Sequence, residues 1–131
     1  MYSPQLLDHF EHPRHAGEVS NPDAVAQIEN PACGDILKLT LKVRNGRIAE
    51  IRFLAKGCVA AMACASAITE LTHGQTVVDA TRLSWQEVMQ FVGGLPEASI
   101  HASHLAVDTL AAAMAACKIR QTAEVPEESS C

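Results

Sequence analysis

The sequence predicts an α+β domain in which helices pack on one face of a small three-stranded antiparallel sheet. Residues 36–44 alternate between apolar and polar side chains, Asn45-Gly46 follows, and residues 47–54 form a second strand-like segment. This pattern is typical of two antiparallel strands joined by a hairpin. One helical segment precedes the strands and several follow them, an order that favours helices on one side of the sheet.

The chain opens with a predicted helix over residues 3–11. Ser3 suits the N-cap position and Pro4 the first helical position, since Pro lacks an N–H that would otherwise stay unpaired. Residues 12–23 are rich in Pro, Gly and Asn and predict a loop. Residues 24–29 predict a short edge strand.

The hairpin register follows from the apolar faces of the two strands. A two-residue loop would set Leu41 opposite Glu50, out of phase with the buried face. A three-residue loop, Arg44-Asn45-Gly46 with a left-handed Gly46, sets Leu41 opposite Ala49. The sequence analysis therefore predicts a bulged three-residue hairpin, with Ala49, Ile51 and Phe53 on the buried face.

Helical patterns fill the rest of the chain. Predicted helices cover residues 58–73, 76–80, 84–92 and 100–119, with Ser84 and Glu87 forming a capping box. Ser99 is the expected N-cap of the last helix. Residues 1–121 are predicted to form a single domain, and residues 122–131 a flexible acidic tail.

Composition excludes several classes of protein. Of the 131 residues, 48% are hydrophobic and 4% aromatic, and the net charge is −5. Outside the last ten residues, twelve acidic residues face ten basic ones. This balance lacks the basic surface of a nucleic-acid binder. Because neither a signal-peptide pattern nor an apolar run of about 18 residues is seen, we expect a cytoplasmic protein without a membrane partner.

The cysteine pattern argues against a disulfide framework. The count is odd, at five, and no two cysteines form a Cys-x-x-Cys pair, so a zinc ribbon or a thioredoxin-type site is not expected.

Three segments carry side chains that bind metals. Cys33 and Asp35 flank Gly34 in a turn before a strand, and Cys58 follows Gly57 at the start of a helix, where the helix dipole should lower its thiol pKa. His101 and His104 lie three residues apart at the start of the last helix. Thiolate, imidazole and carboxylate are ligand types for zinc and iron–sulfur clusters. Each segment alone is weak evidence, so a metal site requires that they meet in space.

These segments resemble the iron–sulfur cluster assembly scaffolds of the IscU/NifU type, over residues 2–118. The resemblance rests on four stretches: Asp8-His9-Phe10-Glu11-His12-Pro13-Arg14-His15-Ala16-Gly17, Asn30-Pro31-Ala32-Cys33-Gly34-Asp35, Lys56-Gly57-Cys58, and Ile100-His101-Ala102-Ser103-His104-Leu105-Ala106-Val107-Asp108. The resemblance implies a non-catalytic scaffold that holds a transient [2Fe–2S] cluster, or a zinc or iron ion, at Cys33, Asp35, Cys58 and His101. It also implies two kinds of partner, a cysteine desulfurase and apo iron–sulfur client proteins.

Two positions depart from the family pattern. A cysteine should follow His101, and this chain has Ala102. His104 is the best-placed substitute donor, although packing or surface exposure is the more common role for such a residue. The segment Leu95-Pro96-Glu97-Ala98-Ser99 keeps only the first two residues of the family's Leu-Pro-Pro-Val-Lys motif, which leaves recognition by the dedicated chaperone doubtful.

Three functions are compatible with the sequence. The first is a cluster-assembly scaffold that passes its cluster to apo-proteins. The second is a metal-poor, non-assembling homologue that docks on a desulfurase or a client, which Ala102 would favour. The third is a thiol enzyme that uses Cys58 with His101 as base.

Overall fold

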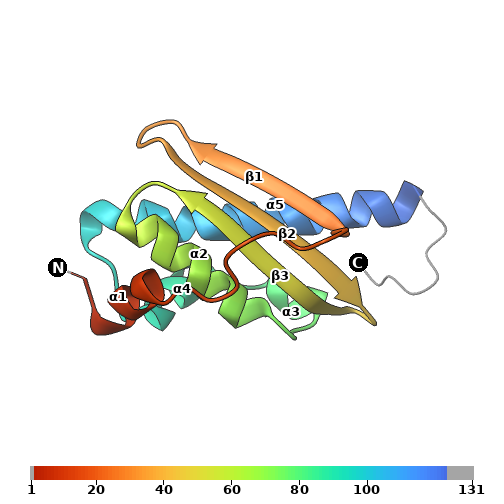
Figure 1. Ribbon diagram of the computed structural model, residues 1–131, viewed down its shortest axis with the longest axis horizontal. Helices are drawn as coiled ribbons and strands as arrows, with labels where there is room; N and C mark the ends of the chain where they lie inside the picture. The colour runs from red at the N-terminus through yellow and green to blue at the C-terminus, as the bar shows by residue number, and fades with distance from the viewer. Residues whose placement is uncertain (1, 124–131) are drawn as a thin grey trace.

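The computed structural model describes residues 2–123, with side chains to residue 117 (Figure 1). Their elements run in the order α1 (Pro4–Glu11), β1 (Ala24–Asn30), β2 (Asp35–Arg44), β3 (Arg47–Lys56), α2 (Val59–Thr72), α3 (Val77–Thr81), α4 (Trp85–Phe91), the 3-10 helix η1 (Glu97–Ser99) and α5 (His101–Ala123). The expected α+β class is confirmed. The helix α5 extends into the first two residues of the predicted tail, and the rest of that tail lies outside the described residues.

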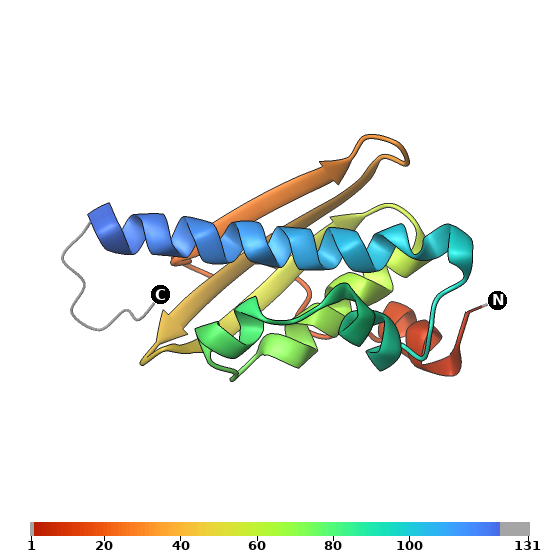
Figure 2. The ribbon, with the colours of Figure 1, turned by 180° about the vertical axis from the view of Figure 1, so that it is seen from behind.

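The three strands form one antiparallel sheet in the order β1-β2-β3. Its inner face carries apolar side chains from every strand, and α2 and α5 pack against it (Figure 2). The largest fully buried side chains of this face are Leu37, Leu39, Leu41, Val43, Ile48 and Ile51. Helix α2 contributes mostly alanines to the core, and such small side chains let a helix lie close to the sheet.

The loop between α1 and β1 crosses the other face of the sheet (Figure 1). Ala16 pairs with Phe53 as a parallel bridge at the edge of β3. The Val19 backbone N–H donates to Thr40 Oγ1 at 2.9 Å, and Thr40 is only 2% exposed. Part of the face without helices is therefore covered by this loop.

The hairpin between β2 and β3 differs from the expected one. Arg44 pairs with Arg47, so the loop has two residues, Asn45 and Gly46, with φ of 54° and 75°. Lys42 pairs with Glu50 and Val43 with Ile48, which leaves Ala49 as the extra residue of a bulge. The expected three-residue loop and the pairing of Leu41 with Ala49 are therefore wrong. Positive φ at both loop residues gives a tight turn that suits the strand twist. The bulge then returns the apolar side chains of β3 to the buried face of the sheet.

The bulge changes which side chains of β3 face the core. Leu41 pairs with Ile51, Ile48 is fully buried and Ala49 is exposed. The expected burial of Ala49 is wrong, whereas that of Ile51 and Phe53 is confirmed.

The helix ends agree with the sequence at most positions. The Ser3 side chain accepts from the Leu6 backbone N–H, and Ser84 and Glu87 form the predicted capping box. Ser99 is not the N-cap that the sequence predicts for the last helix. It is the last residue of η1 and lacks the extended backbone of an N-cap. The short 3-10 turn leads directly into α5 at His101.

One helical stretch is long and apolar enough to cross a membrane. This stretch, Glu97–Cys117, has a mean hydropathy of 1.2, but half of it is buried inside the protein. The core helix of a globular protein has the same properties, so the stretch is weak evidence for a membrane span.

Helix α1 is attached to α2 through a buried histidine. His9 is 5% exposed, and its Nδ1 lies 2.9 Å from Ser66 Oγ while its Nε2 lies 3.3 Å from Glu70 Oε1. Burial lowers the pKa of His9, and the nearby Arg14 lowers it further. A neutral imidazole thus joins the two helices.

We expect Leu39→Ala to destabilise the protein by about 2–5 kcal/mol, because Leu39 is fully buried at the centre of the sheet. Urea unfolding followed by circular dichroism measures this loss. Val25→Ala is the matched control, since Val25 lies on β1 but is 46% exposed, and it should change the free energy of unfolding by less than about 0.5 kcal/mol. Equal losses in the two variants would contradict this account of the core.

Candidate metal centre

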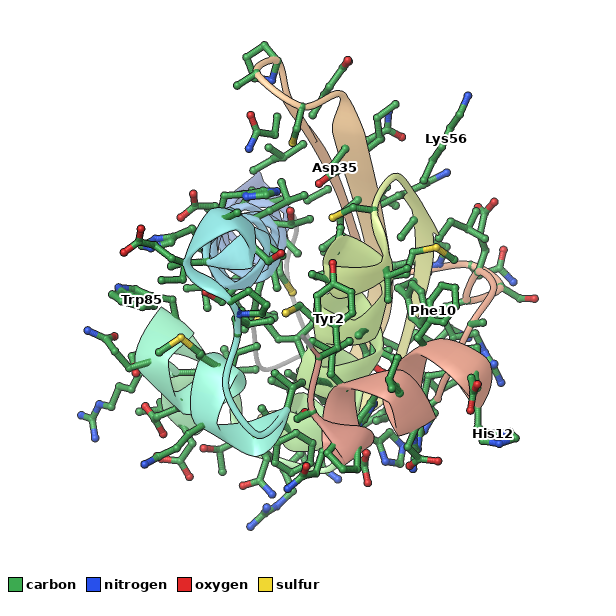
Figure 3. The ribbon with its side chains drawn as sticks, turned by 90° about the vertical axis from the view of Figure 1, so that its left-hand side faces the viewer. Tyr2, Phe10, His12, Asp35, Lys56 and Trp85 are labelled. Atoms are coloured by element: carbon green, nitrogen blue, oxygen red, sulfur yellow. The ribbon has the colours of Figure 1, made fainter. Side chains whose placement is uncertain are left out.

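Three chain segments far apart in the sequence meet at one end of the molecule. They are the turn between β1 and β2, the junction of β3 with α2, and the start of α5 (Figure 1). In a view onto this end, Asp35 lies between α5 and α2 (Figure 3). The antiparallel hairpins bring the first two segments together, and the packing of α5 on the sheet adds the third.

Asp35, the first residue of β2, is the meeting point of the three segments. Its side chain is almost fully buried, with the residue 2% exposed. Its Oδ1 accepts from the Cys58 backbone N–H at 3.0 Å, and its Oδ2 accepts from the Cys58 thiol at 3.3 Å. The same Oδ2 lies 3.3 Å from His101 Nε2. One carboxylate therefore contacts the starts of both α2 and α5.

These contacts determine the ionisation of Asp35. Burial alone would raise the pKa of its carboxyl group. Hydrogen bonds from the Cys58 backbone, from the Cys33 and Cys58 thiols and from His101 outweigh burial and lower that pKa. Asp35 is therefore a carboxylate at neutral pH.

Cys58 is the N-cap residue of α2, and its Sγ accepts from the Ala61 backbone N–H at 3.3 Å. Its thiol pKa is nevertheless raised, first by burial and then by the hydrogen bond and the negative charge of Asp35. The Ala61 and Ala60 amides act in the opposite direction but are outweighed. The expected lowering by the helix dipole is wrong for the protein without a metal, because burial of the thiol, with the Asp35 carboxylate beside it, outweighs the helix amides.

His101 begins α5, and its two ring nitrogens have different partners. Nδ1 lies 3.1 Å from the Ala98 carbonyl oxygen, which can only accept, so Nδ1 carries a proton. Nε2 points toward Asp35. Metal-binding histidines are usually oriented in this way, with one nitrogen donating to a carbonyl and the other facing the metal.

Cys33 lies in the exposed turn before β2. One ligand atom each from Cys33, Asp35 and His101 lies within 4.8 Å of the other two, a spacing that could hold a metal ion. Cys58 adjoins this group through Asp35 Oδ2. The four predicted ligands are therefore brought together.

The other candidate donor, His104, does not join this group of close donors. His104 is exposed, and its ring stacks on Trp85 with centroids 4.3 Å apart. Ala102 is 1% exposed and belongs to the core, as does Cys64, which is fully buried. Burial raises the pKa of Cys64 to about 12. Within the part of the chain that the structure describes, only Cys33, Asp35 and His101 form a group of three close donors.

Gly57 has a role that the sequence analysis missed. It has a φ of 147°, and a Cβ at this position would overlap the Asp35 carboxylate. Only glycine allows the backbone to pass this close to the buried side chain. The sequence signal was the glycine directly before a predicted ligand cysteine, but the buried neighbour could not be read from the sequence.

Comparison with known proteins agrees with this architecture. The family model described as "NifU-like N terminal domain" matches residues 1–124. "Iron-sulfur cluster assembly scaffold protein IscU 1" of Archaeoglobus fulgidus is 40% identical over 110 residues, covering 84% of this chain and 72% of the relative. "Iron-sulfur cluster assembly scaffold protein IscU" of Escherichia coli is 35% identical over 127 residues, covering 94% and 98%.

A solved structure shares the fold. The crystal structure of a "Putative iron-sulfur cluster assembly scaffold protein for SUF system" from Fervidobacterium islandicum superposes with a TM-score of 0.72 at 19% identity, covering 86% of this chain and 96% of the other. The family match spans nearly the whole chain, and the relatives align over most of their length. The chain belongs to the NifU-like N-terminal domain family, the family of the IscU-type iron–sulfur cluster assembly scaffolds.

Proposed function

We propose that this chain assembles a [2Fe–2S] cluster as its cargo at Cys33, Asp35, Cys58 and His101 and passes it to apo-proteins. The observation that carries this proposal is the contact of two thiols and an imidazole, from three segments, with the single carboxylate of Asp35. The donor set suits iron–sulfur clusters, for which histidine can replace cysteine. The same four donors could bind a zinc or iron ion.

The chemistry of the donors suits transfer rather than permanent storage. Cys33 is exposed at the edge of the site, whereas Asp35 is buried. A cluster held by two thiolates, a carboxylate and an imidazole has two ligands that bind iron less firmly than thiolate. Loading displaces protons, because thiolates are the binding form of cysteine. The raised thiol pKa of Cys58 adds to the cost of loading.

The proposal includes the partners and the compartment. A cysteine desulfurase would supply sulfur, and Cys33 would be the more accessible acceptor because it is exposed. Apo iron–sulfur proteins would receive the cluster in the cytoplasm. In the segment Leu95–Ser99, only the first two residues match the motif by which the family's dedicated chaperone recognises its scaffold. The proposal therefore does not include this chaperone as a partner.

We expect anaerobic incubation with iron, sulfide and a cysteine desulfurase to give the wild-type protein the visible absorbance of sulfur-to-iron charge transfer. Cys58→Ala should lose most of this absorbance, because it removes a thiolate ligand. Cys64→Ala is the matched control, since Cys64 lies on the same helix but is fully buried away from the site.

Equal absorbance in the three proteins would contradict the proposed ligands. Wild-type protein that binds the desulfurase but takes up neither iron nor zinc would instead support the second candidate function, a non-assembling interaction module.

We expect Gly57→Ala to reduce the cluster yield at least several-fold, because its Cβ would displace the Asp35 carboxylate. Absorbance per chain after reconstitution measures the yield. Gly94→Ala is the control, because Gly94 also has a positive φ, 97°, but has no atom within 4 Å of an added Cβ. Both variants should carry the backbone strain of an alanine at positive φ, about 1–2 kcal/mol. A similar yield from the two variants would show that Asp35 does not need this close approach.

We expect Ala102→Cys to increase the cluster yield, because the family resemblance places a ligand cysteine directly after His101. Iron and sulfide content per chain is the measurement. Ala102→Ser is the matched control, since it adds a polar atom of similar position without a thiolate. Ala102 is nearly fully buried, so both variants should lose some stability. If the cysteine variant holds no more cluster than the serine variant, the alanine at position 102 does not limit assembly.

A further inference from the structure

Two histidines meet at the opposite end of α2 from Cys58. Cys58 is the N-cap of this helix and His73 is its C-cap, so the two residues are about 22 Å apart along the axis at 1.5 Å per residue. His15, from the loop between α1 and β1, places its ring 5.0 Å from that of His73, measured between centroids. The proposed cluster site uses neither residue.

Hydrogen bonds determine which nitrogen of His73 is free. Its Nε2 lies 3.1 Å from the Ala49 carbonyl oxygen. A carbonyl can only accept, so Nε2 carries the proton and donates it. In the neutral ring, Nδ1 therefore keeps its lone pair.

The same reasoning applies to His15, whose Nδ1 lies 3.3 Å from Thr69 Oγ1. The Thr69 hydroxyl has one proton, and it donates toward the carbonyl oxygens of Arg14 and Ser66, at 3.0 and 2.7 Å. Toward His15 the hydroxyl must therefore accept, so His15 Nδ1 carries the proton and Nε2 keeps its lone pair. Both rings are oriented by a bond at one nitrogen, as is usual for metal-binding histidines.

The surroundings contain charges of both signs. The rings line a cavity of about 220 Å³ together with Glu50, Ile51 and Arg52. The Arg52 guanidinium opposes a cation, but it donates to the Ala16 carbonyl oxygen at 3.3 Å, and the negatively charged Glu50 lines the same cavity. Burial lowers the pKa of His15, with His73 and Arg52 adding to the effect, so its ring is neutral near pH 7. The carbonyl end of α2 at His73 also favours a positive charge.

The spacing of the rings suits a shared ion. Two imidazoles bound to one tetrahedral zinc at roughly 2.0–2.1 Å have ring centroids about 5 Å apart, which agrees with the 5.0 Å seen here. We propose that His15 Nε2 and His73 Nδ1 form a second metal site for a divalent transition-metal ion such as zinc. Water molecules complete the coordination.

Zinc titration of the full chain by calorimetry, at neutral pH and without chelators, tests the proposal. We expect the wild-type protein to bind two equivalents, one at each site. His73→Gln keeps a hydrogen-bond donor for the Ala49 carbonyl oxygen. His15→Asn keeps a donor for Thr69, and asparagine tolerates the φ of 60° at this position. Each variant should weaken one equivalent at least about tenfold and leave the other unchanged. His12→Asn, which removes an exposed histidine elsewhere, should bind like the wild type.

Cobalt separates the two sites by their absorbance. Cobalt bound by Cys33 or Cys58 gives thiolate charge-transfer bands, which His15→Asn and His73→Gln should preserve and Cys58→Ala should reduce. An ion at the histidine pair gives only weaker ligand-field bands. A single zinc equivalent that survives both histidine substitutions, or a second equivalent that survives them, would overturn the proposal. Neither result would affect the cluster site, which Cys58→Ala tests by itself.

Discussion

The buried carboxylate of Asp35 organises the functional end of this protein. A carboxylate that is 2% exposed must be matched by hydrogen-bond donors, because an unpaired buried charge is very unfavourable. The Cys58 amide and thiol donate to it from the start of α2, His101 Nε2 at the start of α5 lies 3.3 Å away, and Gly57 provides the space for it. The backbone at the start of β2, the N-cap of α2 and the first residue of α5 are thus held in one arrangement before any metal arrives.

The Asp35 carboxylate also affects the ionisation of the Cys58 thiol. Burial opposes ionisation of the Cys58 thiol, and the charge that positions Cys58 adds a further opposition. A cation at the site would remove this opposition by neutralising the carboxylate. Loading and thiol ionisation are therefore coupled, and the site is oriented without being strongly nucleophilic. This favours a scaffold over a thiol enzyme that uses Cys58 with His101 as base.

The rest of the fold gives the site a rigid base and an open edge. The apolar face of the sheet is closed by α2 and α5, whose first turns carry Cys58 and His101. Because α2 is rich in alanine, it can lie close to the sheet, and its N-terminus comes near the start of β2. Cys33 differs from the other three proposed ligands, since it lies in an exposed turn. One proposed ligand is thus open to solvent while the others are anchored in the domain.

The sequence by itself predicted the fold class, nearly every element and, through its resemblance to the family, the four residues that meet at the site. These features depend on local patterns: alternation in β2, capping at Ser3 and Ser84, and metal-binding residue types at the ends of elements.

The tertiary structure decided the rest, because the deciding contacts join residues far apart in the chain. The bulge at Ala49 depends on which β3 side chains the helices bury, and the raised thiol pKa of Cys58 depends on its burial and on a carboxylate 23 residues away. The need for glycine at position 57 and the meeting of His15 with His73 likewise follow only from packing in space.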